Sequence, residues 1–141
     1  MDSDKIHQAQ QFIAAIPHCT ALGMRFDHAE DGVVEMSLPY DARFVGDPET
    51  GVIHGGAVFA LLDTTCGAAV ISHPDTVGAT ATIDLRIDYM RPATPGQTIR
   101  TRATCYRVTR SVAFVRAEAL DDDDGLPVAT ATGAFTAERA K

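Results

Sequence analysis

The chain has 141 residues, 45% of them hydrophobic and 22% charged, a composition that suits one globular domain with its own core. A formal net charge of −7 and the lack of any basic stretch exclude a typical nucleic-acid-binding protein. The first residues lack the basic region and apolar run of a secretory signal, and no apolar stretch reaches the ~20 residues of a membrane span, so we expect a cytoplasmic protein without a membrane partner.

The N-terminal part of the sequence predicts a helix and a hairpin. Apolar residues recur at helical spacing over residues 3–16, and Pro17 is expected to end that helix. Strands are expected over residues 24–30 and 33–38, because the second segment alternates between apolar and polar residues. Asp31-Gly32, between the two strands, is typical of a hairpin turn.

A long apolar helix is predicted at the centre of the sequence. It follows an ordered loop over residues 39–50, spans about residues 55–72 and ends at the turn His73-Pro74-Asp75. The segment is apolar on nearly every face, which is typical of a buried helix. Asp63 lies halfway along it, and a buried charged side chain is costly unless it is paired or used. Asp63 is therefore the first candidate for a functional residue.

After residue 78 the sequence predicts only strands. Four are expected, joined as a meander, at residues 80–91, 98–109, 111–120 and 127–137. The aspartate run at residues 121–124 is expected to be a solvated hairpin tip. Together with the first hairpin, these strands predict one curved antiparallel sheet of about five to six strands, whose apolar face only the long central helix can cover. The predicted architecture is a single α+β domain over residues 1–141.

The start of the central helix is predicted to bind a polarised oxygen. Its first backbone N–H groups have no partner within the helix and carry the positive end of the helix dipole, and Gly55 and Gly56 leave access to them. Along the helix axis, Gly55 and Asp63 lie about 12 Å apart, too far to contact one reacting carbon. Either the two residues serve different purposes, or the site pairs Gly55 of one chain with Asp63 of another. The second option predicts a two-fold dimer with composite sites.

With this architecture, the segment His54-Gly55-Gly56-x₆-Asp63 resembles the hotdog-fold acyl-CoA thioesterases, in the branch typified by the phenylacetate-degradation (PaaI-like) enzymes. The resemblance continues over residues 83–93, a long strand that ends in a tyrosine-hydrophobe-x-proline pattern, and reaches Gly133. It covers about residues 22–136. The resemblance implies a hotdog fold, with the long helix wrapped by the curved sheet.

The resemblance also implies the reaction, which is hydrolysis of an acyl- or aryl-acyl-CoA to the free acid and coenzyme A. Coenzyme A is then part of the substrate, and neither a cofactor nor a metal is expected. The cysteines fit this expectation, because Cys19, Cys66 and Cys105 are widely spaced and form no Cys-x-x-Cys or Cys/His pattern, so we expect reduced thiols. A homodimer is expected, and assembly into a homotetramer is left open.

Four residues are implied to be catalytic by their match to the family. Asp63 would act as the nucleophile or as a general base on water, and the Gly55 N–H would polarise the thioester carbonyl with His54 beside it. Thr82 stands where relatives commonly have a hydroxyl residue that positions the water or the carboxylate. His54 is otherwise interpreted as a loop anchor, and Thr82 as an ordinary strand residue.

Five further residues are expected to bind the substrate. Gly56 belongs to the helix start, and Asp47 stands where relatives often have asparagine, so that it either takes over an orienting contact or shapes the loop. Arg91, Arg110 and Ser111 lie where the phosphates of coenzyme A are expected. The alternative interpretation of the arginines is that they are solvated charges at strand ends.

Two other functions remain open from the sequence. A hotdog dehydratase acting on hydroxyacyl thioesters is disfavoured by the spacing from His54 to Asp63. A non-catalytic acyl-CoA-binding module would have no need of Asp63. The acyl group itself is not determined, because the expected pocket suits a medium-chain or an aromatic group equally well, with the lining residues Phe44, Val58, Leu61, Leu62 and Tyr89.

Overall fold

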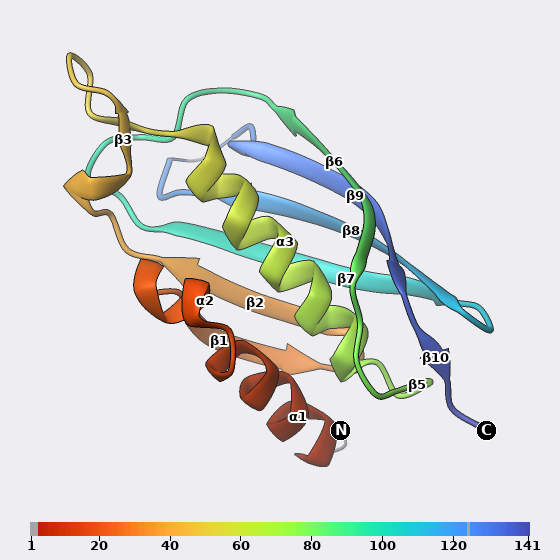
Figure 1. The fold of residues 1–141 in the computed structure, drawn as a ribbon. Helices are drawn as coiled ribbons and strands as arrows, with labels where there is room; N and C mark the ends of the chain where they lie inside the picture. Colours follow the sequence, from red (N-terminus) through yellow and green to blue (C-terminus); the bar gives the residue numbers. More distant parts are fainter. Residues whose placement is uncertain (1–2, 124) are drawn as a thin grey trace.

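The computed structural model describes residues 3–123 and 125–141, so that Asp124 of the aspartate run lies outside the described residues. One long helix lies across a curved antiparallel sheet, and two shorter helices lie beside it (Figure 1). The helices are α1 (Ser3–Ala14), α2 (Pro17–Leu22) and α3 (Gly55–Ser72), with a 3₁₀ turn, η1 (Ala42–Phe44). The predicted α+β architecture is confirmed.

The main sheet of the described chain has six strands in the order β1-β2-β7-β8-β9-β6, and all neighbours are antiparallel. These strands are β1 (Arg25–Glu30), β2 (Val33–Leu38), β6 (Thr82–Tyr89), β7 (Ile99–Val108), β8 (Val112–Leu120) and β9 (Ala129–Thr136). Two smaller ladders pair β3 (Val45–Asp47) with β4 (Val52–Ile53), and β5 (Thr76–Val77) with β10 (Glu138–Arg139).

The predicted meander is wrong at one strand. β6 pairs with β9 rather than with β7, the next strand along the chain, and so forms one of the two edges of the sheet, opposite β1. The connection over residues 90–98 first stays beside the β8–β9 hairpin, since the Met90 N–H donates to the Val128 carbonyl, and then crosses to β7. Gly133 permits the close pairing with β6, because a Cβ there would lie 2.5 Å from the Asp84 carbonyl oxygen.

The N-terminal predictions are partly corrected. α1 ends at Ala14, and Pro17 begins α2 instead of only ending the first helix. At the first position of a helix, proline loses no hydrogen bond and its fixed φ suits the helix. The hairpin turn is confirmed, since Asp31 and Gly32 have φ angles of 43° and 83° between β1 and β2. The loop predicted over residues 39–50 contains η1 and β3.

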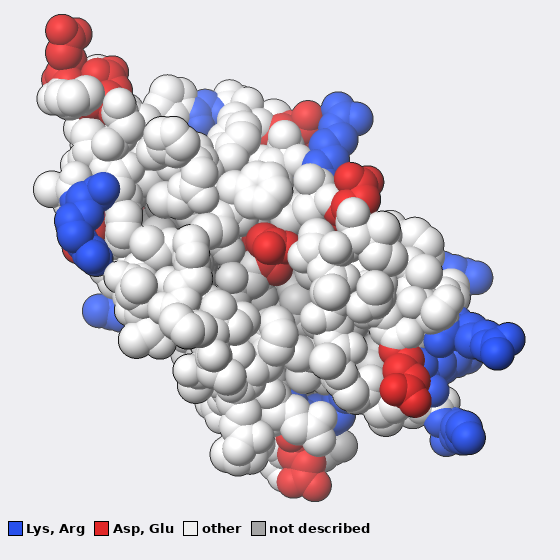
Figure 2. Space-filling model, viewed as in Figure 1, with Lys and Arg blue, Asp and Glu red and all other residues white. Residues whose placement is uncertain are grey.

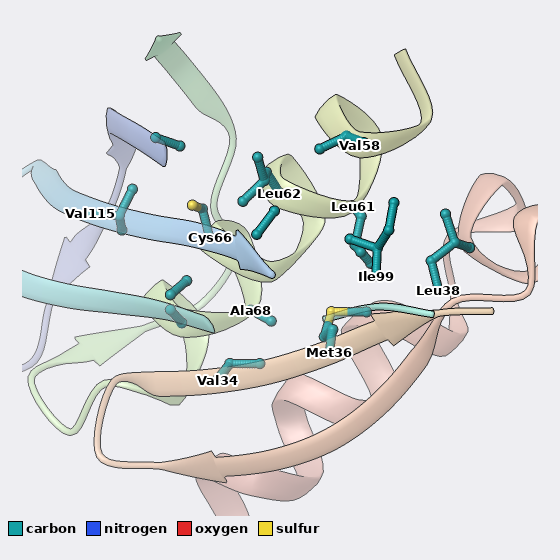
Figure 3. Close-up of a cluster of buried hydrophobic side chains, with 14 of the residues drawn as sticks. Val34, Met36, Leu38, Val58, Leu61, Leu62, Cys66, Ala68, Ile99 and Val115 are labelled. Atoms are coloured by element: carbon teal, nitrogen blue, oxygen red, sulfur yellow. The ribbon is translucent and has the colours of Figure 1, made fainter. Parts of the chain in front are cut away.

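The core lies between α3 and the sheet. Figure 3 shows Leu61, Leu62 and Cys66 on α3 near Met36 and Ile99 on the strands. None of these five side chains has exposed surface. The dense packing of such an interior fixes the position and rotation of α3, and with them the direction in which its other side chains point.

The two halves of α3 differ in exposure. Residues 65–72 are all buried, but Gly56 and Phe59 are exposed, the latter by 40%, so the prediction of a helix buried on nearly every face is wrong for the first half. By length and mean hydropathy alone, 1.5 over 18 residues, α3 is long and apolar enough to cross a membrane. Of these 18 residues, 61% are buried inside the fold, as in a core helix.

Candidate active site

Asp63 lies on the partly open side of α3, beside a cavity of about 350 Å³. Gly56, Ala60 and Gly67 line the same cavity, since residues three or four apart share one face of a helix. The Thr82 hydroxyl, at the start of β6, donates a hydrogen bond of 2.6 Å to Oδ1 of Asp63. The structure therefore brings the predicted carboxylate and the predicted hydroxyl residue together.

No lysine or arginine of the described chain neutralises Asp63 in this cavity. Among the described residues that line it, none is a lysine or an arginine, and His18 at its edge is exposed. Figure 2 shows this face of the molecule with a single acidic group near its centre and with lysine and arginine at the periphery. A carboxylate that accepts one hydroxyl hydrogen bond keeps other lone pairs for a water or a substrate.

Cys19 lies close enough to Asp63 to feel its charge, but its thiol is unsuited to act as a nucleophile. Its thiol lies 3.7 Å from the Thr64 hydroxyl but is buried, with 2% of the residue exposed. Burial is the main cause that raises the pKa of Cys19, and the negative charge of Asp63 raises it further. Because the thiolate is the reactive form of cysteine, a raised pKa makes this thiol unreactive at neutral pH.

The start of α3 has one backbone donor left over. Nδ1 of His54 accepts a hydrogen bond of 2.8 Å from the Gly56 N–H, and the His54 carbonyl accepts one of 3.0 Å from the Ala57 N–H. Within the described residues, the Gly55 N–H has no acceptor. His54 is thus an N-cap that orients the helix start. The predicted donor, Gly55, is the group that remains available to a ligand.

Tyr89, one of the residues expected in the acyl pocket, contacts the start of α3. Its hydroxyl donates a hydrogen bond of 2.8 Å to the Gly55 carbonyl, and a Cβ added to Gly55 would lie 3.3 Å from its ring. Partial loss of water around the ring raises the pKa of Tyr89, so that the phenol stays protonated as a donor. β6 therefore contacts α3 at both ends, through Thr82 at Asp63 and through Tyr89 at Gly55.

The predicted acyl-pocket residues lie mostly in the core. Phe44 is 7% exposed and Leu61 and Leu62 are fully buried, so their side chains pack against the sheet. Val58 and Tyr89 line a second hollow of about 330 Å³ next to Gly55. Beside Asp63, the apolar lining comes partly from α3, with Phe59 and Ala60, and partly from α1 and β9, with Phe12 and Phe135, which the helical pattern of α3 gave no means to identify.

Asp47 is placed in the loop before α3, on the exposed strand β3. Its carboxylate accepts hydrogen bonds from the Glu49 N–H at 3.0 Å and the Thr50 hydroxyl at 2.9 Å. Both partners belong to the same turn. Of the two roles considered for Asp47, these contacts favour shaping the loop.

The predicted phosphate-binding residues lie at opposite ends of the sheet. Arg91 follows the end of β6 and forms two hydrogen bonds to the Asp121 carboxylate, at 2.7 and 2.8 Å. Arg110 and Ser111 form the β7–β8 hairpin tip near the start of β6, and their carbonyls accept backbone hydrogen bonds from the C-terminal segment. Within the described residues, no three histidine, cysteine, aspartate or glutamate side chains are grouped as in a metal site.

Residues 50–128 match the family model described as the thioesterase superfamily. The chain belongs to this superfamily. Escherichia coli YigI, a medium/long-chain acyl-CoA thioesterase, is 26% identical over 139 residues, which cover 89% of this chain and 88% of YigI. The predicted class of enzyme, a thioester hydrolase, is confirmed by this membership.

Solved structures agree on the fold. A Pseudomonas aeruginosa protein is 43% identical and superposes with a TM-score of 0.82, covering 94% of this chain and 98% of its own. The PaaI protein of the E. coli phenylacetic acid degradation operon superposes with a TM-score of 0.84 at 21% identity, covering 96% and 94%. The predicted hotdog fold and the resemblance to PaaI-like proteins are confirmed.

Proposed function

We propose that this protein is an acyl-CoA thioesterase that hydrolyses an acyl- or aryl-acyl-CoA to the free acid and coenzyme A. The observation that carries the proposal is the Asp63 carboxylate, held by the Thr82 hydroxyl at 2.6 Å beside a cavity whose described lining has no lysine or arginine. The superfamily membership and the acyl-CoA thioesterase activity named for YigI support the same reaction.

The active site is proposed to form between two copies of the chain. β6 is an edge strand, and exposed apolar residues gather along and beyond it, with Ile83 56%, Tyr89 51% and Met90 47% exposed. An unpaired strand edge with apolar side chains readily pairs with a second chain. The exposed face of Phe59 on α3 would be covered by the same partner.

The contacts of β6 explain why such a dimer completes the site. Around a two-fold axis, β6 pairs antiparallel with its copy, so the Tyr89 end of one strand lies opposite the Thr82 end of the other. Tyr89 holds Gly55 and Thr82 holds Asp63, so the Gly55 N–H of one chain is brought toward the Asp63 of its partner. Within one chain these groups are about 12 Å apart along α3.

The chemistry follows from these groups. The Gly55 N–H donates to the thioester carbonyl oxygen and stabilises the negative charge that develops there. Asp63 either attacks the carbonyl carbon or removes a proton from the water that attacks it. If Asp63 attacks, the C–S bond breaks to leave a mixed anhydride on Asp63, and water then hydrolyses this anhydride to the acid and the free carboxylate. If water attacks, the C–S bond breaks to give the acid directly. In both routes the thiolate of coenzyme A leaves and takes up a proton. The Thr82 hydroxyl fixes one carboxylate oxygen, so that the other faces the reacting carbon.

Coenzyme A phosphates are proposed to lie near the β7–β8 hairpin tip. Figure 2 shows lysine and arginine side chains gathered at the end of the molecule where Figure 1 shows β10 and the C-terminus. Arg110 and Arg139 are exposed there, and the Arg139 N–H donates to the Arg110 carbonyl at 3.3 Å. On a chain with a net charge of −7, such a cluster is a local site for anions.

The test is a thiol-release assay with a panel of acyl-CoAs, on the unmutated chain and on Asp63→Asn. We expect turnover of at least one substrate, and a fall of about 10³-fold in Asp63→Asn without loss of folding or dimerisation. Binding of acyl-CoA by the unmutated chain with no turnover on any substrate would replace the proposal by the non-catalytic binding module.

A further inference from the structure

The cavity beside Asp63 has an apolar end that the reaction itself does not use. One turn beyond Asp63, about 6 Å along the helix axis, Gly67 lines the cavity together with Phe12 of α1 and Phe135 of β9. No charged side chain lies between these three residues and Asp63 among the described lining residues. An apolar recess directly beside the catalytic carboxylate suits the hydrocarbon part of a substrate.

We propose that this recess is the acyl pocket, that α1 forms its outer wall, and that Gly67 limits the length of the acyl group. The substrates are then acyl-CoAs with a medium-length alkyl chain or a single aryl ring, since the cavity of about 350 Å³ is near the lower end of the size range of ligand sites. This assignment rests on the proposed thioesterase function.

Gly67 is at a position where packing does not demand a glycine. A Cβ built there would lie 3.4 Å from two ring atoms of Phe12 and 3.7 Å from the ring of Phe135, which is ordinary van der Waals contact. Inside a helix, glycine is less stable than alanine. A methyl group at this position would therefore be tolerated by the fold and would stand between Phe12 and Phe135, at the apolar end of the cavity that Gly67 lines.

The wall contributed by α1 links the N-terminal helix to substrate choice. Phe12 is half-buried, and together with Ile16 it faces the cavity from the side opposite β6. Ile6 lies on the same helix and packs on the core, but it lines a different hollow, next to β1. Ile6 is therefore a matched position for testing whether α1 acts through the pocket or only through stability.

The experiment measures kcat/KM for saturated acyl-CoAs from butyryl- to palmitoyl-CoA and for phenylacetyl-CoA. In Gly67→Ala we expect kcat/KM for the longest accepted acyl group to fall about tenfold or more, because one added carbon fills the end of the pocket. The value for the shortest acyl group should be nearly unchanged. The Tm should stay equal or rise. Phe12→Ala should move the preference toward longer chains, and Ile6→Ala should leave the length profile unchanged.

The outcomes separate the two proposals. If Gly67→Ala and Phe12→Ala are both folded and active and both keep the chain-length preference of the unmutated protein, the pocket assignment is overturned. The proposed thioesterase function would not be affected by that result. A change of profile in Ile6→Ala equal to that in Phe12→Ala would also overturn it, since the effect would then come from stability. Absence of hydrolysis by the unmutated chain on every substrate would overturn the proposed function and this assignment with it.

Discussion

Two carboxylates in this molecule, Asp63 beside the cavity and Asp121 at the β8–β9 hairpin, are held in opposite ways. The Asp121 side chain has no exposed surface and accepts hydrogen bonds from Arg91 and from the Thr94 and Asp123 N–H groups. Asp63 is partly exposed, and Thr82 is the one hydrogen-bond donor it has in the described chain. The more deeply buried carboxylate is thus the one whose hydrogen-bonding capacity is filled.

On the proposed assignment of Asp63 as the catalytic carboxylate, unused hydrogen-bonding capacity distinguishes it from Asp121 better than burial does. A charge that is paired and fully hydrogen-bonded inside the fold has little capacity left for a substrate. Asp63 retains lone pairs, and the Gly55 N–H at the start of the same helix is likewise left without an acceptor in the described part of the chain. Replacement of Asp63 should therefore lower activity, whereas replacement of Asp121 should lower stability.

The largest expected effect is the contrast in activity between the two carboxylates. Asp63→Asn should lower kcat/KM by about 10³-fold with little change in Tm. Asp121→Asn should keep kcat/KM within a few-fold of the unmutated value, because its contacts fix the connection after β6 and not the cavity. Thiol release and thermal unfolding measured on the same preparations check both; a comparable loss of activity in the two variants would refute the distinction.

The second prediction concerns the unused donor. Gly55→Pro removes the N–H at a position where proline suits a helix, and the preceding residue, His54, has the extended ψ of 136° that proline requires. Gly55→Ala is the matched control, since it adds the same carbon against Tyr89 but keeps the N–H. We expect kcat/KM about 10²-fold lower in Gly55→Pro than in Gly55→Ala. Equal kinetics in the two variants would remove the Gly55 N–H from the mechanism.

The third prediction concerns the stability that Asp121 supplies. Hydrogen bonds from Arg91 hold the pKa of Asp121 well below its usual range, so its contribution to the free energy of unfolding is present above the ordinary aspartate pKa of about 4 and is lost as pH falls below it. Asp121→Asn should lower that free energy by about 2 kcal/mol at neutral pH, and by less in acid. Denaturant unfolding between neutral pH and about pH 3 measures this, and a pH-independent difference would contradict it.

Much of the fold follows from local signals in the sequence. α3 begins and ends at the predicted residues, because His54 caps its first turn and the His73-Pro74 turn ends it. β2 likewise spans the predicted residues 33–38, where one face is buried and alternation is clear. The pairing of β6 with β9 was not predictable. It depends on where the connection over residues 90–98 crosses the sheet, and on the close approach of β6 that the missing side chain of Gly133 permits.

The residues of the proposed site could be named from the sequence, but their arrangement could not. Asp63, Gly55 and Thr82 were identified from the helix pattern and the family resemblance, whereas the contacts that Tyr89 makes to Gly55 need the tertiary structure. The aspartate run was expected to be solvated, and Asp122 and Asp123 are exposed as expected, but Asp121 is buried. Its partner, Arg91, is 30 residues away, beyond the reach of a local pattern.

The most direct test of the composite site is complementation between two inactive variants. Asp63→Asn and Gly55→Pro are mixed, unfolded and refolded together, so that half of the dimers hold one copy of each. If Gly55 of one chain works with Asp63 of its partner, each mixed dimer regains one intact site and the mixture recovers about a quarter of the unmutated activity. If both groups act within one chain, no site is restored and the mixture stays as inactive as its components.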